Sequence, residues 1–134
     1  MADNETQGTT STRYERKLIE SGGVMVRDEL IAGIFKGCPI KISQAGEYKR
    51  GLLMMENNGE YIPATAAGTK NKNCIILADD LTLVSGEYAE AAGYYFGRFK
   101  ADKIILAYET ENDSHDELID AIRINLRMQH IELV

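Results

Sequence analysis

Two histidines and one pair of adjacent aspartates are the residues whose chemistry would first suggest catalysis. His115 stands at the start of a helical pattern and His130 near its end, so helix electrostatics accounts for both. Asp79 and Asp80 would suit an acid–base or metal pair, but adjacent residues of a strand point to opposite faces. We interpret the pair as the end of a strand. We therefore expect no enzyme activity, no catalytic or metal-binding residue, and no cofactor.

Other patterns with chemical potential also have simpler explanations. The segment 93–97 lacks the Lys-Ser/Thr pair and the following helix of a phosphate-binding loop. Cys38 and Cys74 have no zinc or redox spacing and are typical of small buried hydrophobes, with a disulfide as the alternative. Four tyrosines have two interpretations. They could form a stacking platform for bases or sugars, or they could pack in the core or between subunits. These residues are Tyr88, Tyr94, Tyr95 and Tyr108.

Composition and charge exclude several classes of partner. The chain has 134 residues, of which 44% are hydrophobic and 27% charged, and this predicts one soluble domain with its own core. The formal net charge of −6 argues against binding nucleic acid by neutralising its phosphates. No apolar run has the length of a signal peptide or of a membrane span. We expect a protein made in the cytoplasm that binds neither nucleic acid nor membrane.

The body of the chain shows mostly the two-residue period of β-strands. Ile40 and Ile42 alternate with a polar lysine, and the segments 52–55 and 60–62 flank Asn-Asn-Gly, which predicts a hairpin. The continuous apolar run 74–78 predicts a central strand that is buried on both faces. The glycines of the segment 93–99 suggest a bend or a close approach of backbone. Further strands are expected at 93–99, 104–106 and 131–134.

One helix is predicted close to the C-terminus. Ser114 and Glu117 fit a capping box, and acidic residues fill the first turn. Leu118, Ile122 and Leu126 recur every four residues as one apolar stripe. The sequence therefore predicts a mainly β fold with one C-terminal helix, at the margin of the α+β class.

Residues 1–23 are predicted to form an extended arm, and 24–134 a single β-rich domain. The first 13 residues contain no large aliphatic residue after Met1, and Ser-Gly-Gly closes the segment at 21–23. A purely solvating tail, which is the alternative, would not need the apolar anchors further along the arm. The candidate binding residues of the arm are Arg13, Tyr14, Leu18 and Ile19.

An ordered series of motifs resembles the phage head decoration proteins of the lambda protein D type. The series departs from the family in the run Leu-Leu-Met-Met at 52–55, where smaller and β-branched residues are expected, and in the charges of its arm. The segment 30–42 resembles the opening of the family more weakly. The motifs are YKRGLLM (48–54), GEYIP (59–63), NCIILADDL (73–81), AAGYYFGRF (91–99), KIILA (103–107) and LRMQHIEL (126–133).

The resemblance implies a small β-clip or β-tulip domain that decorates the outer capsid surface of a virion. Its partners would be the major capsid protein, reached through the arm, and two further copies of the chain in a homotrimer at local threefold sites. Such a cement protein stabilises the expanded head against the pressure of packaged DNA. The aromatic strand offers a trimer contact at Tyr94, Tyr95, Phe96 and Phe99. The alternatives are a trimeric nucleotide-processing enzyme of β-clip type and a carbohydrate-binding surface module.

Overall fold

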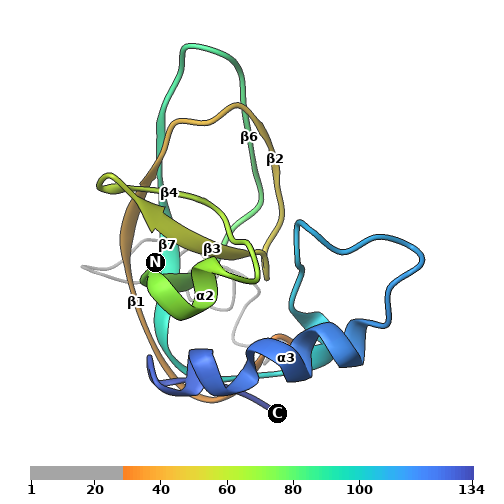
Figure 1. Cartoon of the computed structure of the whole chain (residues 1–134). Coiled ribbons are helices and arrows are strands. Elements are labelled where there is room, and N and C mark those ends of the chain that lie inside the picture. Colours follow the sequence, from red (N-terminus) through yellow and green to blue (C-terminus); the bar gives the residue numbers. More distant parts are fainter. Residues whose placement is uncertain (1–28) are drawn as a thin grey trace.

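The computed structural model describes residues 29–134, which form a strand-rich body with one long helix (Figure 1). No helix in this part of the chain has the length and apolar character needed to cross a membrane. The strands are β1 (Ile31–Ile42), β2 (Gly46–Tyr48), β3 (Leu53–Asn57), β4 (Glu60–Pro63), β5 (Cys74–Leu77), β6 (Leu81–Leu83), β7 (Ala89–Phe99) and β8 (Ile131–Leu133). The helices are α2 (Gly68–Asn71), α3 (His115–Arg127) and the 3-10 turn η1 (Ala101–Lys103).

The strand β7 organises the sheet. The strand order is β1-β7-β5-β3-β4, with every neighbouring pair antiparallel. β7 has two successive neighbours on the side away from β1. Its residues Gly93 and Tyr94 pair with β5, and its residues Gly97 to Phe99 pair with β8, which runs parallel to it. The short strands β2 and β6 pair separately as a ribbon at the top of Figure 1. The long β7 therefore belongs to both ends of the molecule.

Two apolar clusters fill the interior, and β5 contributes to both. Cys74 and Ile76 belong to one cluster, whereas Ile75 and Leu77 belong to the other, because successive strand residues point to opposite faces. The helix-side core consists of Leu30, Leu53, Ala64, Cys74, Ile76, Ala78, Tyr94, Phe99, Ile104, Leu106, Ile119, Ile122, Leu126, Ile131 and Leu133. The ribbon-side core consists of Ile40, Ile42, Tyr48, Leu52, Met54, Ile75, Leu77 and Leu83.

The predicted hairpin and helix are confirmed. Asn58 and Gly59 turn the chain between β3 and β4 with φ angles of 55° and 84°, as an Asn-Gly turn requires. The Oγ atom of Ser114 accepts a hydrogen bond of 3.4 Å from the backbone N–H of Glu117 at the start of α3. The buried face of α3 is centred on Ile119, Ile122 and Leu126, whereas Leu118 is only partly buried. The fold class is mainly β with one long C-terminal helix, as the sequence predicted.

The strand expected at residues 104–106 is not formed. The chain makes the turn η1 there, followed by a single parallel bridge between Leu52 and Ile105. The reason is that β3 already pairs with β4 and β5, so only the residues before it remain open. The side chains still alternate between the two faces: Ile104 and Leu106 are buried and Ile105 is 40% exposed.

Candidate functional site

The two histidines occupy structural positions. Both nitrogens of the His115 ring are hydrogen-bonded, Nδ1 to a Glu109 carboxylate oxygen at 2.7 Å and Nε2 to the carbonyl oxygen of Ala101 at 2.8 Å. These two acceptors raise the pKa of His115. His130 has a φ of 70° in the turn between α3 and β8, and its ring lies 6.0 Å from that of Phe96. Within residues 29–134, no three His, Cys, Asp or Glu side chains gather as a metal-binding group.

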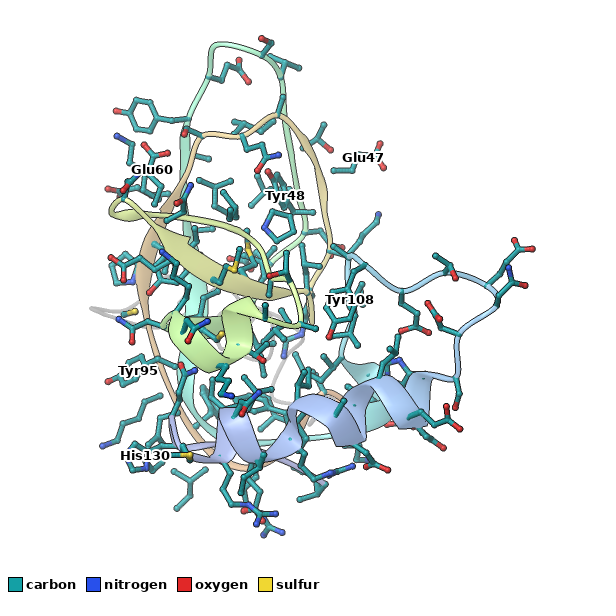
Figure 2. The ribbon with its side chains drawn as sticks, in the orientation of Figure 1. Glu47, Tyr48, Glu60, Tyr95, Tyr108 and His130 are labelled. Atoms are coloured by element: carbon teal, nitrogen blue, oxygen red, sulfur yellow. The ribbon has the colours of Figure 1, made fainter. Side chains whose placement is uncertain are left out.

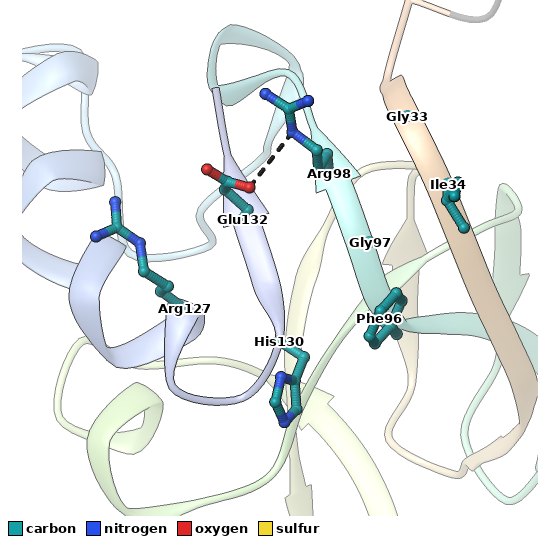
Figure 3. A pocket seen from close by; sticks show the side chains of 8 residues that line it. All are labelled: Gly33, Ile34, Phe96, Gly97, Arg98, Arg127, His130 and Glu132. Carbon is teal, nitrogen blue, oxygen red and sulfur yellow. Dashed lines mark ion pairs between the residues drawn. The ribbon is translucent and has the colours of Figure 1, made fainter.

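A groove lies across β1, β7 and β8 and reaches the last turn of α3, and we call it the basic groove (Figure 3). It has a volume of about 570 Å³ and lies on the outer face of the strands, opposite the helix-side core. Its apolar part consists of Ile34, which is 77% exposed, and the half-buried Phe96. The lining residues are Gly33, Ile34, Phe96, Gly97, Arg98, Arg127, His130 and Glu132.

Glycines allow the strands of the basic groove to approach closely. Gly97 has a φ of 141°, and a Cβ atom there would lie 2.5 Å from the carbonyl oxygen of Ile34. A Cβ atom on Gly33 would lie 3.3 Å from Cδ of Arg98, so the stem of that arginine extends over the bare backbone of β1. The expectation of close backbone approach in the segment 93–99 is therefore confirmed. Neither Gly33 nor Gly97 places a side chain in the groove.

Cationic side chains outnumber carboxylates in the basic groove. Arg98 forms an ion pair with Glu132 at 3.3 Å, drawn as a dashed line in Figure 3. Arg127 lies at the opposite rim and is exposed, and its side chain has no partner within the described part of the chain. The Nζ atom of Lys36 lies 5.0 Å from the centroid of the Phe96 ring, which is a cation–π distance. Two arginines and one carboxylate thus line the groove, and Lys36 adds a third cation beside Phe96, on a chain whose net charge is −6.

A second groove contains both cysteines and lies on the other side of the α3–β8 turn. Gln129 fixes the turn: its Oε1 accepts a bond from the Cys74 backbone N–H at 2.8 Å, and its Nε2 donates to the carbonyl oxygens of Thr69 and Lys72, each at 3.0 Å. Both thiols are free, and burial raises the pKa of Cys74 to about 11. Such a thiol is a poor nucleophile at neutral pH. The lining residues are Cys38, Tyr61, Asn73, Cys74, Ile75, Tyr95, Met128 and Gln129.

Arg50 has a structural role that the sequence did not reveal. The pair Lys49-Arg50 suggests a solvated strand start, but Arg50 is half-buried. Its Nη1 donates to the carbonyl oxygen of Ala78 at 2.7 Å and to the Tyr94 hydroxyl at 2.9 Å. Its backbone N–H donates to Oδ1 of Asp80 at 2.7 Å. The aspartate pair therefore follows the end of β5, as expected. Asp80 also accepts a hydrogen bond from the turn that precedes β3.

The predicted trimer contact is divided between the interior and the surface. Tyr94 and Phe99 are fully buried in the helix-side core, with their rings stacked at a centroid distance of 5.5 Å. This corrects the prediction for these two residues, because a side chain inside one copy cannot contact another. Tyr95 is 43% exposed and Phe96 is half-buried, so both remain available. The predicted arm residues Arg13, Tyr14, Leu18 and Ile19 lie outside the described residues.

The tyrosines do not form one platform. Tyr94 lies in the helix-side core. Tyr88 is 66% exposed, and the centroid of its ring lies 4.8 Å from the Nζ atom of Lys41. Figure 2 shows Tyr95 on the side of His130 and Tyr108 on the opposite side, beside the loop that leads to α3. These positions separate the aromatic rings that a stacking surface would need to bring together.

The sequence did not reveal the basic groove, since its cations come from separate segments. Lys36, Arg98 and Arg127 lie far apart in the sequence, on β1, β7 and the last turn of α3, and the packing of these elements brings them to one surface. In comparisons with known proteins, no family model and no curated protein matches the chain. The likeness to head decoration proteins therefore rests on the chain's own motifs.

Proposed function

We propose that the protein is a phage capsid decoration protein that binds the outer surface of the expanded head as trimers and stabilises it. Its partner is the major capsid protein, and its place is the virion exterior. The proposal needs no catalytic group, metal or cofactor. The function is mechanical, because a rigid body that is fastened to several capsid subunits opposes their separation.

The observation that carries the proposal is that the family-like motifs together supply most of the strands and the interior of the described domain. The motif segments supply β3, β4, β5, β7, β8 and the end of α3. Residues from five of them meet in the helix-side core, including Leu53, Ile76 and Tyr94, together with Leu106 and Ile131. The ordered motifs therefore describe the body of one fold and not isolated segments, and the proposal rests on that ordered series.

The position of β1 supports a role for the N-terminal segment. β1 lies at one end of the sheet order, and the chain enters it directly from the residues that precede Glu29. The far end of β1 is fastened to β4 through Glu60, which accepts a hydrogen bond from Ser43 and pairs with Lys41 at 3.7 Å. The start of β1 lies beside the basic groove. An arm that leaves from this edge can reach a neighbouring subunit while the body stays folded.

Removing the arm tests the proposal. A chain that begins at Gly23 should keep its thermal transition, because the described cores lie wholly within residues 29–134. It should bind purified, expanded, undecorated capsids more weakly by a factor of about 10²–10⁴, because three linked arms contribute through avidity. Twenty-three extended residues can reach roughly 75–80 Å, which is enough to cross onto a neighbouring subunit. Binding is measured by co-sedimentation with the capsids.

A full-length variant makes the same test without truncation. Replacing Tyr14, Leu18 and Ile19 by serine removes the apolar anchors, whereas replacing Thr9, Thr10 and Thr12 by serine is the matched control. We expect the first variant to lose binding and the control to keep it. Full-strength binding by the chain that begins at Gly23 would place the interface on the β body. Failure of the intact protein to bind any expanded capsid would contradict decoration itself.

A further inference from the structure

The two ends of α3 carry surfaces of opposite charge. At its start, the loop before the helix projects from the body, at the right of Figure 1, and continues into the first helical turn. We call residues 109–117 the acidic loop; its exposed carboxylates belong to Glu111, Asp113, Asp116 and Glu117. At the other end lies the basic groove, with Arg127 in the last turn. The 13 residues of α3 separate the two surfaces by about 20 Å.

The helix dipole explains only part of this arrangement. It favours carboxylates in the first turn, such as Asp116 and Glu117, and a cation in the last turn, such as Arg127. It does not account for Glu111, which lies before the helix, or for the cations that β1 and β7 contribute. Both surfaces therefore carry more charge than stabilisation of α3 requires.

The two surfaces also resemble each other in their apolar content. The basic groove contains Ile34, 77% exposed, beside the ring of Phe96. Ile105, which is 40% exposed, borders the base of the acidic loop in a shallow groove with Asp102 and Glu109. An interface that combines exposed apolar residues with complementary charge at its rim is the usual composition of protein–protein contacts. One surface projects and the other is hollow, so they suit each other in outline.

We propose that the acidic loop of one copy of this chain binds in the basic groove of a second copy. Lys36 and Arg127 receive the carboxylates of Glu111 and Asp116, and Ile34 meets the apolar base of the loop. The contact joins two different surfaces, so the copy that gives its loop keeps a free groove and the copy that receives it keeps a free loop. Repetition of such a heterologous contact closes a ring when the rotation per copy permits it. The inference specifies how the trimer of the proposed function assembles.

Charge reversal on each surface tests the pairing with purified protein and without capsids. The groove-reversed variant carries Lys36→Glu and Arg127→Glu, and the loop-reversed variant carries Glu111→Lys and Asp116→Lys. A third variant carries all four substitutions and has the net charge of the natural chain. All four positions are exposed. Self-association is measured by sedimentation velocity over a range of concentrations, and circular dichroism monitors folding.

Matched controls make the same change of net charge elsewhere on the surface. Lys49→Glu with Lys70→Glu is the control for the groove-reversed variant, and Glu47→Lys with Glu90→Lys for the loop-reversed variant; these residues are also exposed. We expect each reversed variant to associate at least about tenfold more weakly than its control, and the four-substitution variant to regain association. Association of the natural chain should weaken at roughly 0.5 M salt, where charges are strongly screened.

Cross-linking makes weak association measurable. A zero-length carbodiimide reagent joins lysine to carboxylate only when the two are in contact, and mixing isotope-labelled with unlabelled chains identifies links between copies. We expect a link from Lys36 to the acidic loop. A natural chain that stays monomeric and gives no such link overturns the inference, as does a four-substitution variant that fails to recover. In the latter case the groove serves another acidic partner. Capsid binding is measured separately, so decoration and this pairing can fail independently.

Discussion

The helix-side and ribbon-side cores are covered from solvent by different kinds of element. The helix-side core is covered by α3, a single amphipathic element that places Ile119, Ile122 and Leu126 against the sheet. The ribbon-side core is smaller and is closed partly by β2 and β6, two strands of three residues each. Its closing residues Tyr48 and Leu83 come from segments that are far apart in the chain. The helix-side core thus depends on one continuous helix. The ribbon-side core depends on the pairing of β2 with β6, which are far apart in the sequence.

This difference predicts where stability is concentrated. A helix that buries one face contributes many contacts that form together, whereas a short ribbon contributes few and is easier to open. The region covered by α3 should therefore unfold only with the whole molecule. The ribbon should open locally at lower free energy.

The largest expected effect comes from emptying part of the helix-side core. Ile122 is 1% exposed, and Ile122→Ala should lower the free energy of unfolding by about 2–5 kcal/mol. Leu83→Ala is the matched change in the ribbon-side core, where Leu83 is 5% exposed, and it should cost about 2 kcal/mol or less because the ribbon can relax. Chemical denaturation of both variants checks the order. Equal losses, or a larger loss for Leu83→Ala, would contradict the comparison.

A smaller effect is expected where β7 changes its neighbour from β5 to β8. In Gly97→Ala, the new methyl group meets the carbonyl oxygen of Ile34 and the Cα atom of Phe35, which lies 2.9 Å from the Cβ position. We expect a loss of about 1–3 kcal/mol in the free energy of unfolding. The control is Gly59→Ala in the hairpin turn, where no heavy atom lies within 4 Å and only the backbone strain at a φ of 84° remains, about 1 kcal/mol. If Gly59→Ala lost as much free energy of unfolding as Gly97→Ala, backbone strain and not close strand packing would explain the loss at Gly97.

The smallest effect concerns the pH dependence of the helix-side end. The carbonyl oxygen of Ala101 and the carboxylate of Glu109 raise the pKa of His115 above its unfolded value, and Asp116 adds to this. This stabilisation is fully present below about pH 6.5 and is lost as the pH rises through the folded pKa. The loss should amount to less than about 1 kcal/mol, since the side chain is partly solvated. His115→Gln should flatten the pH profile of thermal stability, measured as the melting temperature at a series of pH values.

Much of the fold followed from patterns that are local in the sequence. The Asn-Gly turn, the apolar run of β5 and the capped helix α3 each depend on neighbouring residues, and each was predicted. The ribbon of β2 and β6 was missed because each strand has only three residues, too few for a two-residue period to be distinctive. The strand predicted at 104–106 was wrong, since the availability of a sheet edge is a property of the tertiary structure.

The candidate site was less predictable than the fold. The aromatic run of β7 suggested a contact surface, but tertiary packing divides it, with Tyr94 inside and Tyr95 outside. The signal that would have indicated this is the strand period itself, which alternates the faces of neighbouring residues. No comparable signal exists for the basic groove, whose cations meet only after β1 and β7 have paired and α3 has packed beside β8.

The pairing of β1 with β7 also has a consequence for the order in which the chain matures. The two strands join positions as distant as Ile42 with Ala89 and Ile31 with Phe99. A ribosome adds about 5–20 residues per second, so β1 emerges several seconds before β7, its one ladder partner within residues 29–134. Topologies with such distant partners also fold slowly, on the scale of milliseconds to seconds. During that interval β1 exposes an unpaired backbone, and its glycines and lysines limit its ability to template aggregation.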